Sequence, residues 1–518
     1  MTGESAVPVV LPKRELYWVF GALMLGMLLA ALDSTIVSTA LPTIVGDLHG
    51  ANHLSWVVVG YLLTSTVSTP LWGKLGDLYG RKAFFQASIL IFLVGSVLSG
   101  LAGSMLSLIL FRALQGLGGG GLMVGAQAVI GDIVPPRDRG RYAGMFGGVF
   151  GAATVLGPLI GGFIVDYWSW RWIFFVNIPL GIVALAVTAT VLPSTSRRVN
   201  HVIDYLGVVI LTVATSALIL VTSLGGVSFA WVSWPSVALT VLALVATGLF
   251  VLVERRSPEP VLAPHLFRNR VFGSASAIGF MIGFAMFGSM VFLPLFFQTV
   301  RGASPTMSGL KLLPLMGAFL VASITVGQLV SKGWRYRPFP IVGSLVMTVG
   351  LILMSTVGVA TSTVILDVDM VVLGLGLGLV MQVLITAVQN AVDQRDLGAA
   401  TAGANFFRSI GGSFGTAVFG ALYANELPRQ LARAFGGHLP STGLGSWTPS
   451  TLRRLPAAEL GLILHAIANS IQFVYRWAIP IGAVAVILSL TLPEVTLRST
   501  IHHPIADEIP FSNTDPLL

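Results

Sequence analysis

Apolar runs of about twenty residues recur along the whole chain, and short polar segments separate them. A run of this length forms a helix that crosses roughly 30 Å of hydrocarbon. The pattern predicts an all-α polytopic membrane protein, because no polar stretch is long enough to form a separate soluble domain. The fourteen predicted transmembrane helices cover residues 17–41, 54–73, 84–101, 105–130, 142–165, 172–192, 205–224, 235–253, 272–297, 306–330, 338–357, 370–392, 400–423 and 473–492.

Composition and charge agree with this class of protein. Hydrophobic residues make up 55% of the 518 residues, and charged residues make up only 10%. Cysteine is absent, which excludes disulfides, thiolate metal sites and thiol redox chemistry. Most of the 29 Lys and Arg residues fall on the side of the predicted helices that carries both termini. Since basic residues concentrate on the cytoplasmic side, both termini are expected there, and the net charge of +8 requires no nucleic-acid partner.

Three segments of the first half of the chain recur in the second half in the same order. The matched segments are 73–82 with 327–337, 116–120 with 374–378, and 137–140 with 395–398. Repeated halves are typical of secondary transporters, whereas chance similarity among Gly-rich helices is the alternative. The predicted organisation is a cytoplasmic N-terminus (1–16), an N-terminal six-helix bundle (17–192), two inserted linker helices (205–253), a C-terminal six-helix bundle (272–492) with a long outer loop (424–472), and a disordered cytoplasmic tail (493–518).

Two charged residues lie inside predicted helices, Asp33 in the first and Arg112 in the fourth. A charge in the bilayer costs several kcal/mol unless it is paired or hydrated, and such residues usually lie on ion, proton or substrate paths. Because Arg stays protonated, it can hold a nearby carboxylate ionised or release it when their separation changes. We therefore expect Asp33 to carry a proton and Arg112 to be its partner, with a static structural pair as the alternative.

A short polar loop joins the second and third predicted helices. Gly73, Gly76 and Gly80 permit a tight turn, and Asp77, Arg81 and Lys82 are expected to pair with one another or with Arg137, Arg139 and Arg141 of the next such loop. These contacts would form a cytoplasmic gate; the alternative is that the basic residues only anchor the loop.

The fifth predicted helix is rich in small residues. Gly151, Gly157, Gly161 and Gly162 favour close helix packing, and Pro158 removes one backbone hydrogen bond. Ordinary packing explains the glycines, but a bend with close contact also suits two bundles that move against each other.

Five segments together resemble the fourteen-helix drug:proton antiporter family of the major facilitator superfamily. They are 32–42 (LDSTIVSTALP), 73–82 (GKLGDLYGRK), 110–119 (LFRALQGLGG), 151–162 (GAATVLGPLIGG) and 170–179 (WRWIFFVNIP). The resemblance covers residues 15–495 and implies a monomeric multidrug exporter of the bacterial inner membrane. It also implies that the proton gradient drives transport without a cofactor, and that the segment at Pro158 is an antiporter motif.

Polar residues in or near the predicted helices are candidates for substrate contacts. They are Tyr61, Gln115, Gln127, Asn177, Gln298, Gln382, Gln389 and Asn405. Each of them also fits a hydrogen bond between helices. Asp367, Asp369 and Asp393 fall at predicted helix ends, so no second deep carboxylate is expected.

Enzymatic function is not expected, because the sequence has no GxxxxGK[ST] phosphate loop and its eight His residues show no metal-ligand spacing. The sequence favours proton-coupled export of hydrophobic or amphipathic small molecules. The alternatives are proton-coupled export of one endogenous compound, such as a siderophore, lipid or antibiotic, and a channel or receptor without coupled transport. The outer loop is expected to be a connector that ends in an interfacial helix at 457–471.

Overall fold

The structure is a computed structural model that describes residues 13–48, 54–134, 136–192, 204–225, 229–436 and 456–496. These residues are helical apart from short turns and one isolated bridge between Gly225 and Phe229. The predicted all-α class is therefore confirmed. Residues 1–12 and 437–455 and most of the predicted tail lie outside the described parts.

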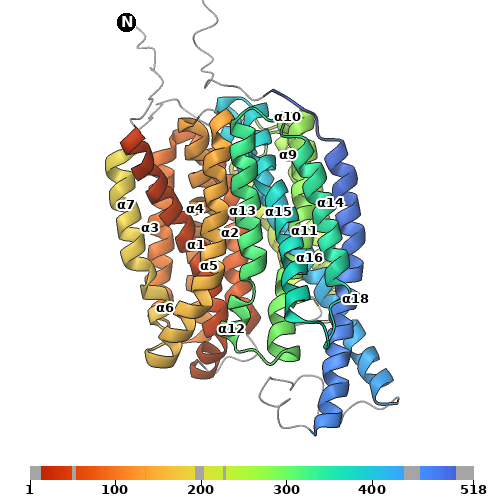
Figure 1. Cartoon of the computed structure of the whole chain (residues 1–518). Helices are drawn as coiled ribbons and strands as arrows, with labels where there is room; N and C mark the ends of the chain where they lie inside the picture. The colour runs from red at the N-terminus through yellow and green to blue at the C-terminus, as the bar shows by residue number, and fades with distance from the viewer. Residues whose placement is uncertain are drawn as a thin grey trace, which may run out of the picture.

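The helices form two groups that stand side by side, with an inserted pair between them in sequence (Figure 1). The first group contains α1 (Lys13–Asp47), α2 (Leu54–Tyr79), α3 (Arg81–Gly100), α4 (Met105–Ile133), α5 (Pro136–Tyr167), α6 (Trp172–Phe175) and α7 (Asn177–Val191). The inserted pair is α8 (Tyr205–Leu224) and α9 (Trp234–Glu254). The second group contains α10 (Pro264–Arg268), α11 (Arg270–Leu295), η2 (Phe296–Val300), α12 (Pro305–Leu310), α13 (Leu313–Ser331), α14 (Pro338–Met354), α15 (Thr363–Ala391), η3 (Gln394–Asp396), α16 (Leu397–Ala434) and α18 (Ala457–Leu490).

Each of the fourteen predicted ranges overlaps one long helix of the described chain. Ten of the described helices are long and apolar enough to cross a membrane, which identifies a multi-pass membrane protein. The helices α2 and α16 are not among these ten, and both are rich in Ser, Thr and Gly. Small residues of this kind favour packing against other helices over contact with lipid.

Packing within the two groups follows the same pattern. In the first group α4 contacts α2 and α3, and α1 contacts α5 and α7. In the second group α15 contacts α13 and α14, and α11 contacts α16 and α18. The groups meet along two seams, one between α5 and α13 and the other between α2 and α16.

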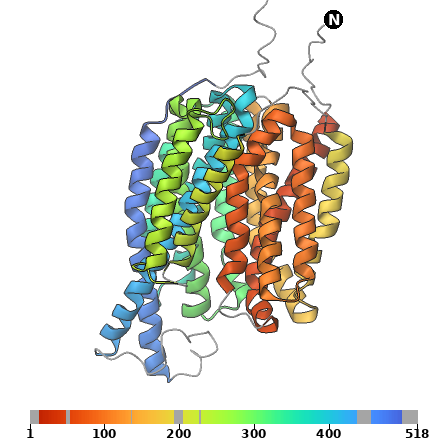
Figure 2. The same cartoon turned by 180° about the vertical axis from the view of Figure 1, so that it is seen from behind.

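The inserted pair lies against the second of these seams, where α8 contacts both α2 and α16 (Figure 2). A buried apolar cluster joins Leu211 of α8 and Phe250 of α9 to Phe406 and Ile410 of α16. Glu254, at the end of α9, accepts hydrogen bonds from the backbone N–H groups of Val261 and Leu262 at 3.1 and 3.3 Å. Both contacts attach the inserted pair to the second group.

The predicted interfacial helix at 457–471 was wrong. This segment is the first half of α18, which continues to Leu490 without a break, and α16 likewise continues to Ala434. Leu431 of α16 is fully buried and joins Ile463 and Ile467 of α18 in the core of the second group. The sequence has no helix breaker between the segment and the last predicted span, so the two form one helix that projects beyond the bundle (Figure 1).

Close approach between α11 and α16 depends on glycine. A Cβ at Gly415 would clash with the backbone carbonyl of Phe284, whereas a Cβ at Gly420 meets no atom within 4 Å. The helix faces therefore touch at Gly415, and Gly420 lies outside the contact.

We predict that Gly415→Ala lowers the melting temperature of the detergent-purified protein, because α11 must move to accommodate the methyl group. Such overpacking typically destabilises by about 1–3 kcal/mol. Gly420→Ala is the matched control, and it should be neutral or slightly stabilising because Ala favours helix over Gly. Equal melting temperatures for both variants and the parent would contradict the close contact.

Candidate functional site

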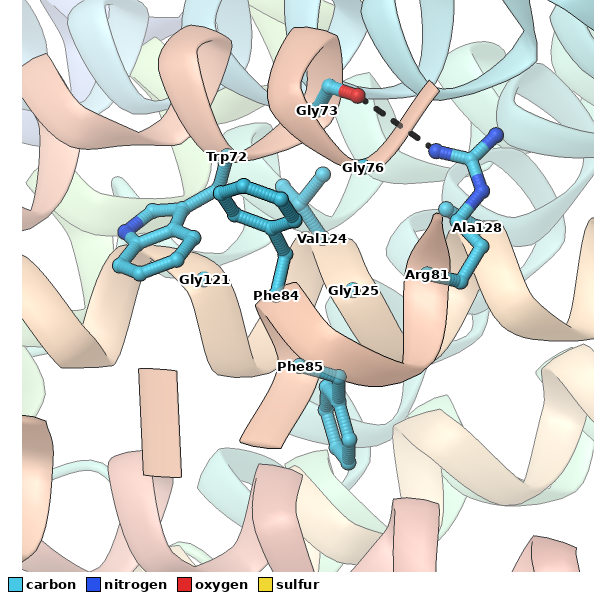
Figure 3. Close-up of a pocket in the computed structure, with 10 residues that line it drawn as sticks. All are labelled: Trp72, Gly73, Gly76, Arg81, Phe84, Phe85, Gly121, Val124, Gly125 and Ala128. Atoms are coloured by element: carbon cyan, nitrogen blue, oxygen red, sulfur yellow. Dashed lines mark hydrogen bonds between the residues drawn. The ribbon is translucent and has the colours of Figure 1, made fainter. Parts of the chain in front are cut away.

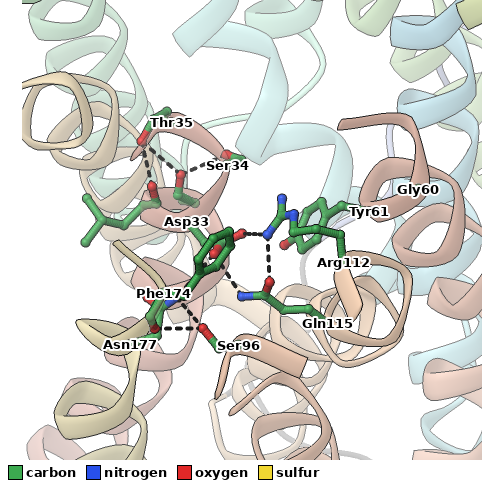
Figure 4. A network of polar contacts seen from close by, with 12 residues as sticks. Asp33, Ser34, Thr35, Gly60, Tyr61, Ser96, Arg112, Gln115, Phe174 and Asn177 are labelled. Carbon is green, nitrogen blue, oxygen red and sulfur yellow. Dashed lines mark hydrogen bonds and ion pairs between the residues drawn. The ribbon is translucent and has the colours of Figure 1, made fainter. Parts of the chain in front are cut away.

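Asp33 and Arg112 form a buried ion pair between α1 and α4 (Figure 4). Arg112 Nη1 lies 2.5 Å from Asp33 Oδ2, and the two residues are 2% and 0% exposed. Gln115 Nε2 and Asn177 Nδ2 both donate to Asp33 Oδ1, at 2.8 and 3.2 Å. The carboxylate thus holds together α1, α4 and α7.

Aromatic and polar side chains enclose this pair. The Arg112 guanidinium lies 4.3 Å from the ring centroid of Tyr61 and 5.8 Å from that of Phe174, which are distances for cation–π contact. Ser96 of α3 accepts a hydrogen bond from Asn177 at 3.0 Å and donates to the Phe174 carbonyl at 2.8 Å. Six helices therefore contribute to one network, since Tyr61 of α2, Ser96 of α3, Arg112 of α4, Phe174 of α6 and Asn177 of α7 surround Asp33 of α1.

Not every buried polar atom of this network has a hydrogen-bond partner among the described residues. Arg112 Nε and Asn177 Oδ1 are buried, and neither has a hydrogen-bond partner among the described residues. A buried pair that only holds helices together normally has its polar atoms satisfied, because each unpaired buried atom costs about 1–3 kcal/mol. The two open positions favour a site whose partners change.

The predicted gate motif lies at the end of the bundle where α2 turns into α3, which we call the latch end. Asp77 accepts hydrogen bonds from the backbone N–H groups of Gly398 at 2.9 Å and Ala399 at 2.6 Å. These N–H groups belong to the first turn of α16, so the carboxylate caps a helix N-terminus and lies at its positive end. Asp77 therefore joins the first helix group to the second.

Arg81 holds the same motif together through ion pairs and a hydrogen bond. It pairs with Asp77 and with Asp132 of α4, the latter at 2.9 Å, and its Nη1 donates to the Gly73 carbonyl at 3.4 Å (Figure 3). Gly80 turns the chain at a φ of 103°, a value that favours glycine. Gly76 has no side chain to block Arg81, whose Nη1 would lie only 3.2 Å from a Cβ there.

Glycine also sets the separation of α2 and α16. A Cβ at Gly73 would lie 2.5 Å from Ala402 Cβ and 2.6 Å from the Gly398 carbonyl oxygen. On the other side of Gly73, a small pocket opens between α2, α3 and α4, lined among others by Trp72, Phe84 and Val124 (Figure 3).

Further polar contacts join the two groups near the latch end. Gln394 donates to Asp132 Oδ1 at 2.7 Å, and Gln389 donates to the Gln127 carbonyl at 3.2 Å. Asn405 donates to Gln127 Oε1 at 2.6 Å. Gln127, Gln389 and Asn405 were candidates for substrate contact, and in this conformation they bond across the seam.

Two expected contacts of the gate motif differ in the structure. Lys82 donates to the carbonyls of Ala189 and Leu192 at 2.6 and 2.7 Å, so it caps the C-terminus of α7 within the first group. Arg139 donates to the carbonyls of Val134, Gly131 and Gln389, and its partner there is backbone. Helix C-termini attract cations because their last carbonyls lack partners. The side chains of Arg137 and Arg141 lie outside the described part.

The Gly-Pro segment of α5 faces two neighbours. Gly157 and Gly161 pack against Thr35 and Ile36 of α1. Gly151, Pro158 and Gly162 face the second group, where they approach Met316, Gly309 and Thr306 respectively. Pro158 lies inside one continuous helix. This segment therefore contributes to the seam between α5 and α13.

The predicted substrate residues do not form one cluster in the structure. Tyr61, Gln115 and Asn177 belong to the network around Asp33. Gln298 lies in η2 and Gln382 in α15, and neither side chain hydrogen-bonds to another described residue.

Asp369 was expected at a helix end, and the structure places it near one, but inside the helix. Helix α15 begins at Thr363, seven residues before the predicted start, so Asp369 lies in its second turn and is 4% exposed. The signal was present at Ser362, whose side chain caps the helix by accepting from the Ile365 N–H. Arg408, which lies within α16, was also missed as a candidate.

Comparison with known proteins agrees with this architecture. The family model described as "Major Facilitator Superfamily" matches residues 23–416. A Mycobacterium tuberculosis protein described as an uncharacterised MFS-type transporter is 45% identical over 97% of this chain and 72% of its own length. The Bacillus subtilis multidrug transporter protein MdtP is 37% identical over 92% of this chain and 93% of its own. The B. subtilis multidrug resistance protein 3 is 35% identical over 92% and 95%.

Solved structures share the fold. The human organic anion transporter MFSD10 superposes with a TM-score of 0.65 at 13% identity, over 92% of this chain and all of its own. The proton:xylose symporter XylE superposes with a TM-score of 0.61 at 16% identity, over 94% of this chain and 98% of its own.

The chain belongs to the major facilitator superfamily. It is a multi-pass membrane transporter with relatives named as multidrug transporters, and it is not an enzyme.

The latch contact can be tested with a cysteine reporter, because the natural chain has no cysteine. Thr401→Cys is nearly isosteric and places a thiol in α16 at a position that is fully buried here. We predict that adding Asp77→Asn raises the rate of maleimide labelling of this thiol several-fold, because the α16 N-terminus loses its charged cap.

Asp47→Asn is the matched control, since Asp47 pairs with Arg171 at the opposite end of the bundle. It should leave the labelling rate unchanged. An Asp77→Asn rate equal to that of this control would show that Asp77 does not keep the latch end closed.

Proposed function

We propose that this protein is a proton-coupled antiporter of the fourteen-helix drug:proton type, which exports hydrophobic or amphipathic small molecules across the bacterial cytoplasmic membrane. It acts as a monomer without a cofactor, both termini are cytoplasmic, and the proton gradient drives transport. In this orientation the latch end faces the cytoplasm.

The observation that carries this proposal is the buried pair of Asp33 and Arg112. The guanidinium remains charged throughout, so only the carboxylate can gain or lose a proton. While the two are in contact the carboxylate is ionised. When helix movement separates them, the carboxylate remains in apolar surroundings and binds a proton, because burial disfavours its charged form.

The arrangement of the helices supports alternating access. The six long helices of each group pack in the same pattern, as expected for an internal duplication. The two seams along α5 and α2 then form the surfaces on which one bundle tilts against the other. In the present conformation the polar contacts of the latch close the cytoplasmic side of the α2–α16 seam.

A cycle follows from these parts. Asp33 takes up a proton when the cavity opens outward, and the bundles tilt as the latch at Asp77 opens. The proton is released inward when Arg112 returns to the carboxylate. Substrate binds the deprotonated form from the cytoplasm and leaves outward, so each event requires the other.

Export of drugs is supported by the relatives. MdtP and multidrug resistance protein 3 align over more than nine-tenths of both chains and are named for multidrug transport.

We predict that Asp33→Asn abolishes proton-driven export while the protein remains folded, because an amide cannot exchange a proton. The measurement is proton flux into proteoliposomes on addition of ethidium, together with resistance profiles in an efflux-deficient host. The parent should show proton flux only when substrate is added, which distinguishes it from a channel or a receptor.

Asp47→Asn serves as the control here as well, because it removes an exposed carboxylate outside the buried network. If Asp33→Asn exports every tested compound against a gradient as well as the parent, Asp33 is not the proton carrier.

A further inference from the structure

Arg408 is a second intramembrane arginine, and its surroundings differ from those of Arg112. It lies eleven residues after the start of α16 at Leu397, about 16 Å along the helix at 1.5 Å per residue. Its stem packs against α11, where a Cβ at Gly283 would lie 3.1 Å from Arg408 Cγ. Its Nη2 reaches across to α4 of the first group, where Met123 Sδ lies at 3.8 Å. The guanidinium therefore lies between the two helix groups.

No acidic side chain of the described residues pairs with Arg408. Asp33 is neutralised by Arg112. Asp396 begins the same helix but lies twelve residues away, about 18 Å, beside His265 and Arg395. Asp369 lies 22 residues from the latch end of α15, about 33 Å, whereas Arg408 lies about 16 Å from that end. Because Arg remains protonated in proteins, one positive charge stays uncompensated between the groups.

A second open polar atom lies one turn away. Asn405 is 3% exposed, and its Nδ2 donates to Gln127 Oε1 and to the Thr401 carbonyl. Its Oδ1 is buried and has no hydrogen-bond partner in the described structure. Residues three positions apart share one face of a helix, so the open acceptor and the uncompensated cation are on the same face of α16.

We propose that Arg408 and Asn405 form a binding site for the anionic group of an amphipathic transported molecule. Arg408 binds its carboxylate, sulfonate or phosphate, which matches the planar fork of the guanidinium. Asn405 Oδ1 accepts a hydrogen bond from a hydroxyl or amide N–H of the same molecule. This assignment rests on the proposed transport function and adds a substrate class to it.

The position suits the transport cycle. Arg408 and Asn405 belong to the second group, and their neighbours Met123 and Gln127 belong to the first, so tilting of the groups changes the surroundings of both. A site at a group interface near the middle of the membrane is where secondary transporters bind their substrates.

The test compares two dyes that share a xanthene core but differ in charge, anionic carboxyfluorescein and cationic rhodamine 6G. Equilibrium binding to the full-length protein is measured in phosphatidylcholine nanodiscs. We expect Arg408→Gln to weaken carboxyfluorescein binding about ten- to a hundredfold, the range for one lost charged hydrogen-bond contact. Arg408→Lys should keep part of the affinity, and rhodamine 6G binding should not weaken in either variant.

Asn405→Asp provides a second variant, because it places a carboxylate beside Arg408 without removing the arginine. It should weaken carboxyfluorescein binding in the same way. Arg476→Gln, which removes an exposed arginine of α18, is the matched control and should bind as the parent does.

Three results would overturn the assignment. One is a parent protein that binds rhodamine 6G but neither carboxyfluorescein nor anilinonaphthalene sulfonate. Another is an equal loss of both dyes in Arg408→Gln, which indicates a structural role. The third is displacement of the anionic dye by phosphatidylglycerol, which makes a lipid headgroup the occupant.

The binding test is independent of proton coupling. It is made at equilibrium in nanodiscs, where no proton gradient exists, and substrate-induced proton flux is measured separately in proteoliposomes. If anionic dye binds in an Arg408-dependent way but substrate induces no proton flux, the antiporter is rejected and the anion site is retained. If transport is coupled to protons but does not depend on Arg408, the antiporter is retained and the anion site is rejected.

Discussion

An ionised group inside an apolar helix bundle must be compensated, and this constraint organises the first half of the molecule. The carboxylate of Asp33 is fully buried, and three side chains from two other helices donate to it. Removing one member of such a pair typically costs about 3–5 kcal/mol, because it strands the other charge. The relative positions of α1, α4 and α7 therefore depend on the contacts of a single buried carboxylate.

Helix α4 connects this buried pair to the latch. It carries Arg112 and Gln115 in the half remote from the latch end, Gln127 near the seam, and Asp132 at the end that contacts Arg81. Glycines in its middle bring its backbone close to α2 and α3; a Cβ at Gly118, for example, would clash with Phe92. A shift of α4 that separates Arg112 from Asp33 therefore moves the partners of the latch as well.

The sequence predicted those parts of the site in which side-chain chemistry limits the choices. The pairing of Asp33 with Arg112 was expected because each is costly alone in a membrane, and the structure brings them into contact. The pairing of Asp77 with Arg81 was expected, but its contact with α16 could not be predicted, because the partners there are two backbone N–H groups. The partners of Lys82 could not be predicted for the same reason, because they are backbone carbonyls at the end of α7.

The remaining errors of the sequence-based prediction concern the residues at which helices begin and end. Helices were predicted from apolar runs, but α15 and α18 begin in more polar sequence and extend well beyond those runs. These errors do not affect the predicted order of the helices, because that order does not depend on where each helix begins or ends. The long hairpin of α16 and α18 was not predicted, because its length depends on where these two helices end and begin.

The inserted pair α8 and α9 shares its buried side chains with α16 and is tied to the following linker by Glu254. The pair also packs against α2 of the first group, so it bridges the seam between α2 and α16. If the bundles tilt as proposed, α8 cannot keep its packing on α2 and on α16 at once, so the cost of separating it from one of them becomes part of the energy of the conformational change.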